Sequence, residues 1–151
     1  PISDPMARGV IAGLTLSTTR GELYRALLEA TAFGTRHLLE SIKEAGGEGK
    51  RYVAVGGGTK GGLWTQIMSD VCGIDQVLPK LAIGASYGDA LISAQNVGAA
   101  DADTSWMKVS AHVTPDDDNK GLYDDLFGRY LELYPATKDV AHHLAKLQLG
   151  D

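Results

Sequence analysis

The sequence contains a single cysteine, Cys72, and no group of cysteines and histidines has the spacing of a zinc site. A disulfide within the chain is therefore excluded, and a reducing cytoplasm is the expected compartment. Basic residues are also scarce, since 14 lysines and arginines stand against 19 aspartates and glutamates, for a formal net charge of -5. Proteins that bind nucleic acid usually present a basic face, so nucleic acid is not expected as a partner. No apolar run is long enough to cross a bilayer and no signal peptide is recognised, so no membrane partner is expected either.

The length of 151 residues predicts a single domain over residues 1–151, with enough chain to bury a core. The sequence opens on Pro1-Ile2-Ser3-Asp4-Pro5, without an initiator methionine, and these turn residues lead directly into an apolar run. We therefore expect the sequence to be a piece of a longer protein.

Hydrophobic periodicity predicts an alternation of strands and helices. Short apolar runs typical of buried strands lie at 10–14, 52–55 and 76–78. Helices are predicted at 22–45, 63–72 and 85–94, and in a helical tail over 121–149 that is interrupted near Pro135. Thr19 and Glu22 have the spacing of a capping box at the start of the first helix. Between the third helix and the tail, residues 99–120 are predicted to form an acidic loop.

Several polar side chains invite a functional interpretation but are assigned structural roles. Asp116, Asp117 and Asp118 are consecutive and point different ways, whereas calcium loops alternate their ligands, so a solvated loop is favoured over a metal site. His142 and His143 are neighbours and cannot share one helix face as a metal pair.

Four further side chains are given structural roles in the same way. His37 is expected at a helix surface and Asp70 is expected to face solvent. Cys72 is expected in the core, and Trp106 is expected to pack beneath the acidic loop.

A glycine-rich run, Gly56-Gly57-Gly58-Thr59-Lys60-Gly61-Gly62, lies between the strand at 52–55 and the helix at 63–72. Such a junction leaves backbone N–H groups at a helix N-terminus and removes the side chains that would keep a flat ligand away. The run is therefore a candidate nucleotide site, and the alternative is a plain turn.

Two familiar phosphate-binding motifs fit this run poorly. A dinucleotide fold places an acid about twenty residues further on, at the end of the next strand, but the strand at 76–78 ends in Pro79-Lys80. In a P-loop the lysine is followed by serine or threonine, whereas Lys60 is followed by Gly61. A dinucleotide-binding half-domain is kept as a weaker hypothesis.

Three motifs occur in order along the chain. The first comprises Asp4-Pro5, Arg8-Gly9, Gly13-Leu14, Glu22-Leu23, Ala26-Leu27 and Glu29. The second comprises Gly56-Gly57-Gly58-Thr59-Lys60, Leu63-Trp64, Gln66-Ile67, Ser69-Asp70 and Gly73, and the third runs from Gly84 to Ala90, followed by a tail from Tyr123 to Pro135. Together they resemble the carboxy-terminal half of the FGGY family of carbohydrate kinases, most closely its xylulokinase-like branch.

The resemblance implies an α/β fold of the RNase H-like type, as in actin and the Hsp70 ATPase, and an incomplete half of a two-domain sugar kinase. It implies ATP-dependent phosphorylation of a sugar hydroxyl, on xylulose or a related ketose or polyol, with ATP and Mg²⁺ as cofactors. The adenosine-binding residues would be Gly56, Gly57, Gly58, Thr59, Lys60 and Gly61, with the backbone at Gly57 against the adenine. Two positions depart from the family pattern, because some relatives have asparagine at Gly61 and many have an acid near Ile83.

The resemblance also implies that the catalytic base, the phosphate-holding turn and the sugar-binding residues precede this chain. These 151 residues would then be inactive alone, and their partners would be the amino-terminal domain of the same protein, ATP and the sugar. A homodimer stays open. The competing hypothesis is a non-catalytic nucleotide-binding or interaction module of actin-like fold.

Overall fold

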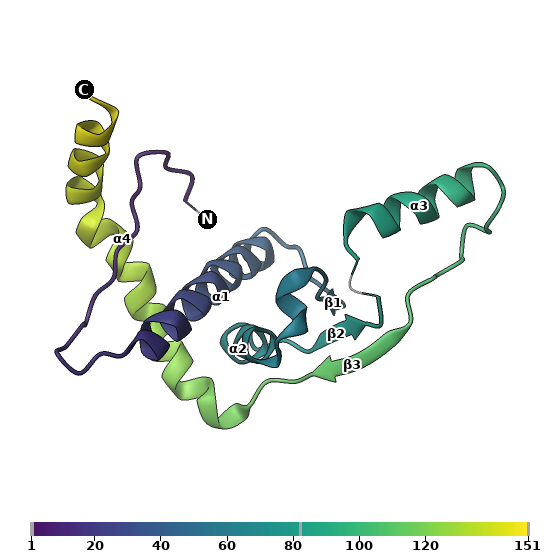
Figure 1. The fold of residues 1–151 in the computed structure, drawn as a ribbon, viewed down its shortest axis with the longest axis horizontal. Coiled ribbons are helices and arrows are strands. Elements are labelled where there is room, and N and C mark those ends of the chain that lie inside the picture. The colour runs from purple at the N-terminus through teal and green to yellow at the C-terminus, as the bar shows by residue number, and fades with distance from the viewer. Residues whose placement is uncertain (1, 82, 151) are drawn as a thin grey trace. The chain divides into compact units, whose positions relative to one another are not determined.

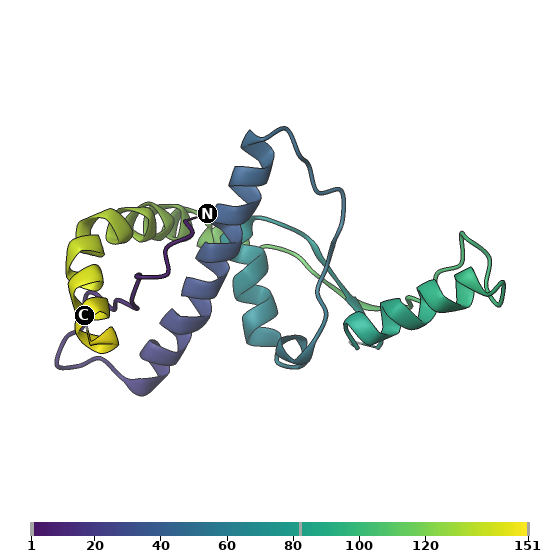
Figure 2. The ribbon, with the colours of Figure 1, turned by 90° about the horizontal axis from the view of Figure 1, so that it is seen from above.

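The computed structural model describes residues 2–81 and 83–150, and it divides the chain into two compact units. We call Glu48–Asp116 the central unit, and the segments up to Gly47 and from Asp117 onward the terminal unit. Figure 1 shows the elements of both units along the chain, and Figure 2 shows them from above. The expectation of a single domain over residues 1–151 stays a prediction.

The terminal unit is built on two long helices, α1 (Arg20–Glu44) and α4 (Lys120–Leu149), with the short 3-10 helix η2 (Asp117–Asn119) before α4. The start of α1 confirms the predicted capping box. The backbone N–H of Glu22 donates to the Thr19 hydroxyl over 3.2 Å, and the Thr19 N–H donates to the Glu22 carboxylate over 2.7 Å. These bonds satisfy N–H groups that the first helical turn leaves without partners.

An aromatic cluster joins α1 to α4. Phe33 of α1 packs edge-on against Tyr123, with ring centroids 6.2 Å apart, and lies 6.1 Å from Phe127. The Arg36 guanidinium lies 4.3 Å from the centroid of the Phe127 ring and forms an ion pair with Asp124 at 2.8 Å. Burial of these rings provides the hydrophobic core of the terminal unit.

Tyr123 carries a polar group into that core. Its side chain is 1% exposed, and its hydroxyl donates to the Glu29 carboxylate over 3.0 Å and accepts from the Arg25 guanidinium over 2.9 Å. Burial, as the largest influence, raises the pKa of Tyr123. The buried hydroxyl is thus fully partnered, as a buried polar group must be.

Asp4 connects the amino-terminal segment to the second half of α4. Its carboxylate lies 2.7 Å from His142 Nε2 and accepts from the Tyr134 hydroxyl over 2.7 Å. The hydrogen bonds with His142 and then with Tyr134 lower the pKa of Asp4 to about 2. His142 is therefore part of an anchoring contact within this unit.

Two sequence predictions in the terminal unit are wrong. Residues 10–14 form no strand, because no described segment pairs with them, and Val10, Ile11 and Leu14 stay exposed. The tail is not interrupted at Pro135, which lies inside the continuous helix α4. The missing N–H of Pro135 removes the helical donor to the Leu131 carbonyl, and the Thr137 hydroxyl donates to the Leu133 carbonyl, two residues before the proline, over 2.7 Å.

The central unit is an α/β arrangement around a three-stranded sheet. Its elements are β1 (Tyr52–Val53), the 3-10 helix η1 (Gly57–Lys60), α2 (Gly62–Cys72), β2 (Gln76–Pro79), α3 (Ala85–Asn96) and β3 (Val109–Val113). The strand order is β1-β2-β3, with β1 and β2 parallel and β2 and β3 antiparallel. Ile67 and Val71 of α2 are each 1% exposed and supply the core of the unit.

Strand β3 corrects the prediction that 99–120 is a loop throughout. Its residues pair with β2 in the register Gln76 opposite Val113 and Val77 opposite His112. The strand forms because the second edge of β2 is available for pairing. The paired residues are 30 or more positions apart in sequence, so local composition does not reveal the pairing.

The structure gives the burial of the four side chains that were assigned structural roles, at positions 37, 70, 72 and 106. Asp70 does not face solvent, since it is 7% exposed and its Oδ1 accepts from Gln66 Nε2 over 2.7 Å and from the Asp116 N–H over 2.9 Å. His37 and Cys72 are half-buried, and Trp106 remains 37% exposed and packs against Tyr87. Asp70 is buried because its carboxylate, on α2, binds the backbone of the segment that follows β3.

Candidate functional site

The glycine run forms a tight turn between β1 and α2. Gly56 has φ 95° and ψ -177°, a conformation that is essentially restricted to glycine. The Thr59 hydroxyl and the Thr59 N–H both donate to the Gly56 carbonyl, over 2.8 and 3.3 Å. These bonds close η1, and Gly61 then serves as the N-cap of α2 in extended conformation, without a side-chain cap.

The four glycines at 56, 57, 58 and 61 have different surroundings. Gly56 is required by its positive φ. A β-carbon at Gly58 would overlap the six-membered ring of Trp64, so this glycine is required by packing inside the protein. At Gly57 and Gly61 an added β-carbon would meet nothing within 4 Å. The backbone at these two positions is therefore open to approach by a ligand.

Helix α2 packs against the glycine turn through Trp64. A small cavity of about 140 Å³ lies between the turn and the helix, lined by Ala54, Val55, Gly58, Thr59, Trp64, Thr65, Met68 and Gln76. Gln76 of β2, 4% exposed, donates through Nε2 to the Thr65 carbonyl over 2.7 Å and to the Ser69 hydroxyl over 2.8 Å. Ser69 in turn donates to the Val113 carbonyl over 3.1 Å. This buried network fixes α2 against the sheet, and α2 holds the glycine turn.

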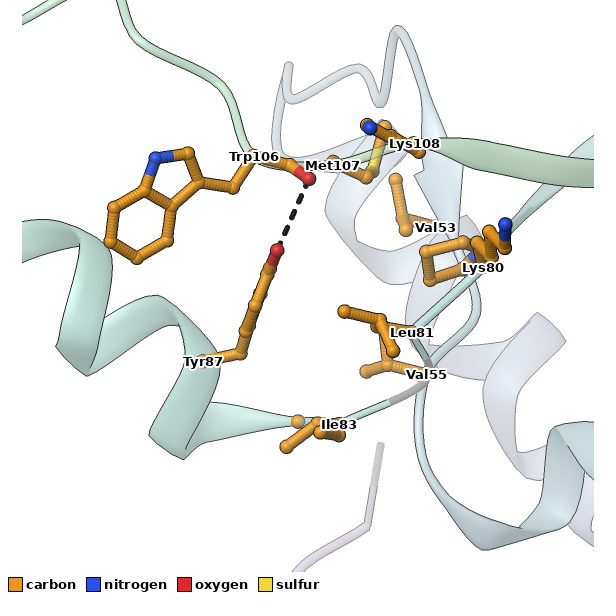
Figure 3. Close-up of a pocket in the computed structure, with 11 residues that line it drawn as sticks. Val53, Val55, Lys80, Leu81, Ile83, Tyr87, Trp106, Met107 and Lys108 are labelled. Carbon is orange, nitrogen blue, oxygen red and sulfur yellow. Dashed lines mark hydrogen bonds between the residues drawn. The ribbon is translucent and has the colours of Figure 1, made fainter.

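A larger cavity, about 500 Å³, opens where the parallel strands β1 and β2 end (Figure 3). Its lining is mostly apolar, with Lys80 and Lys108 as its charged members. Tyr87 of α3 lines one side of it and donates its hydroxyl to the Trp106 carbonyl over 3.2 Å. Open α/β sheets bind ligands outside the carboxyl ends of their strands, so the glycine turn and this cavity occupy the expected edge.

The six residues predicted for adenosine binding, Gly56, Gly57, Gly58, Thr59, Lys60 and Gly61, thus form one continuous turn. Thr59 is half-buried and its hydroxyl donates to the Gly56 carbonyl, whereas Lys60 is exposed. Ile83, where the family pattern has an acid, lines the larger cavity. The binding roles of these residues stay predictions.

Sequence reasoning missed the two residues that support the turn. Trp64 belongs to the second sequence motif, and its large ring, two residues after the end of a glycine run, is a signal for close packing on glycine. Gln76 gave a weaker signal, a polar residue inside an apolar strand, whose partners lie on a helix packed against that strand.

Over residues 2–81 and 83–150, no three histidine, cysteine, aspartate or glutamate side chains lie together so that they could hold a metal ion. In the same described part of the chain, no helix combines the length and apolar character needed to cross a membrane.

Residues 1–97 match the family model for the FGGY family of carbohydrate kinases, C-terminal domain. The chain is 31% identical over 146 residues to an FGGY carbohydrate kinase domain-containing protein of Xenopus laevis, covering 92% of this chain and 26% of that protein. Among solved structures, it is similar to xylulose kinase from Rhodospirillum rubrum, at 34% identity and a TM-score of 0.79, over 92% of this chain and 29% of the kinase. It is also similar to Plasmodium falciparum glycerol kinase with ADP, at 26% identity and a TM-score of 0.68, over 83% of this chain and 26% of that one.

The chain therefore belongs to the FGGY family of carbohydrate kinases. The predicted family is confirmed, as is the α/β fold of an actin-like carboxy-terminal domain. The chain spans about a quarter of the length of the curated relative and of the solved kinases.

Proposed function

We propose that the complete protein is an ATP-dependent sugar kinase and that the turn Gly56–Gly61 holds the adenosine end of the nucleotide. The open backbone at Gly57 and Gly61 carries this proposal, because among residues 2–81 and 83–150 no atom lies close enough to require glycine at either position. A flat base can lie against backbone only where β-carbons are absent. The similarity to a glycerol kinase with ADP supports a nucleotide as the occupant.

Within this proposal each part of the turn has a distinct task. Gly57 lies against the adenine, Gly61 leaves room beside the base and ribose, and Thr59 and Lys60 form the rim. The Thr59 hydroxyl is committed to the Gly56 carbonyl, so it maintains the shape of the turn. When bound, Mg²⁺ neutralises charge on the phosphates during phosphoryl transfer. It would be held mainly by those phosphates and by parts of the kinase that precede this chain.

The proposed acceptor is a sugar hydroxyl, with xylulose or a related ketopentose preferred. Glycerol kinases are 38% identical to this chain but over only 65% of it, whereas the 34% identical xylulose kinase matches 92% of it, and this longer match supports the preference for a ketopentose. The proposed base and sugar-binding residues belong to the three quarters of the relatives' length that this chain does not span. We accordingly propose that residues 1–151 alone do not catalyse the reaction.

A coupled assay of ADP release by the complete protein, with Mg-ATP and xylulose, ribulose, glycerol or gluconate in turn, tests the activity. We expect turnover with a ketopentose and none with the 151-residue chain alone. ATP-binding without turnover on any sugar would favour the non-catalytic module instead.

The site is tested by Gly57→Ala, which places a methyl group on the open face. We expect the KM for ATP to rise about tenfold, equal to about 1.4 kcal/mol, with the KM for the sugar unchanged. The matched control is Gly121→Ala on α4, where an added β-carbon also meets nothing within 4 Å. An unchanged KM for ATP in Gly57→Ala would refute this placement of the adenine.

A further inference from the structure

Gly58 and Trp64 form a contact that the proposed adenosine site does not explain. Trp64 lies in the first turn of α2, is half-buried, and lines the small cavity together with Gly58 and Thr59. Its ring packs so closely over Gly58 that a single added methyl group there would overlap it. The contact is therefore possible only because residue 58 is glycine.

The neighbouring glycines make no such contact. An added β-carbon at Gly57 or Gly61 meets open space, whereas one at Gly58 meets the indole. Gly58 is therefore the glycine of the turn that rests on Trp64, whereas Gly57 and Gly61 are left open. A turn with four glycines in six residues has unusual conformational freedom, and a rigid ring packed against one of them restricts it.

We propose that Trp64 is a positioning residue for the nucleotide. It acts through Gly58 and does not touch the base itself: the indole fixes η1, and so fixes the spacing between the open backbone at Gly57 and at Gly61. This inference rests on the proposed function of the turn. Because a displacement of about 1 Å at a binding group can cost a large factor in rate or affinity, the indole supplies preorganisation of the site.

The test compares substitutions at Trp64 in the complete protein, with steady-state kinetics for ATP and sugar and titration calorimetry with Mg-ADP. Trp64→Ala is expected to raise the KM for ATP and the Kd for Mg-ADP at least tenfold, with the KM for the sugar within about twofold of the original. Trp64→Phe keeps a ring over Gly58 and is expected to restore most of the affinity. The matched control is Tyr24→Ala, which removes a largely exposed aromatic ring from α1 and is expected to leave both KM values unchanged.

Gly58→Ala tests the same contact from the other side and is informative even where Trp64→Ala fails to fold. The added methyl group displaces the indole, so this variant is also expected to weaken Mg-ADP binding about tenfold. In the double variant the clash is gone, and we expect binding no weaker than in Trp64→Ala alone. Such non-additivity is the signature of two residues acting through one contact.

Two results would overturn the positioning role. One is a folded Trp64→Ala variant that binds Mg-ADP as tightly as the original protein. The other is strict additivity of the Gly58 and Trp64 substitutions, which would mean that Gly58 acts on the nucleotide independently. If the unaltered protein binds no Mg-ADP, the proposed function fails together with this inference. If the unaltered protein binds it and the Trp64 variants do so equally well, the positioning role alone fails.

Discussion

Gln76 places a side-chain amide in the buried contact between β2 and α2, and Gln76→Leu tests how firmly that contact holds the helix beneath the glycine turn. Leucine is similar in size and removes only the polar group. The two hydrogen bonds lost, to the Thr65 carbonyl and the Ser69 hydroxyl, are each worth about 1 kcal/mol net. The Thr65 carbonyl is in the helix and the Ser69 hydroxyl keeps its bond to Val113, so little further penalty is expected.

The expected loss is therefore about 2 kcal/mol in the free energy that holds α2 in place. Hydrogen exchange followed by mass spectrometry on the complete protein measures this locally, and peptides covering α2 should exchange about 30-fold faster. The matched control is Gln95→Leu, because Gln95 Nε2 also donates to two acceptors, the Asp101 and Ala102 carbonyls, but in an exposed position. If Gln76→Leu accelerates exchange in α2 no more than Gln95→Leu does, the buried network does not hold the helix.

Two predictions concern the terminal unit. The pKa of Asp4 is about 2 in the folded protein and has an ordinary value of 3.8, so its contact with His142 and Tyr134 stabilises the fold above about pH 4 and is lost as pH falls through 2. An acid titration by circular dichroism should show this step, and Asp4→Asn should remove it; an identical titration in the variant would contradict the assignment. Tyr123→Phe removes the buried hydroxyl bonded to Glu29 and Arg25 and should lower the free energy of unfolding by about 1–3 kcal/mol in urea titrations, whereas no change would show that this network is neutral.

Sequence patterns predicted those elements whose signals are local. The capping box at Thr19 and Glu22 fixed the start of α1, and the left-handed Gly73 closes α2 where the sequence has its glycine. The glycine turn was predictable because strand, turn and helix signals follow one another within twenty residues. Local signals failed at Pro135, because a proline lowers helix stability but packing on either side of it, at Phe127 and Ala141, keeps α4 continuous.

The sequence by itself determined the family, through three ordered motifs, and the position of the candidate nucleotide turn at Gly56–Gly61. Only the tertiary structure separated the glycines of that turn into Gly56 and Gly58, which the protein itself requires, and Gly57 and Gly61, which face open space. It also decided the burial of Gln76 and Asp70 and the pairing of β3 with β2. The physical reason is the same in each case: whether a backbone position is open or a polar side chain is satisfied depends on atoms that folding brings from other elements, and no local pattern specifies them.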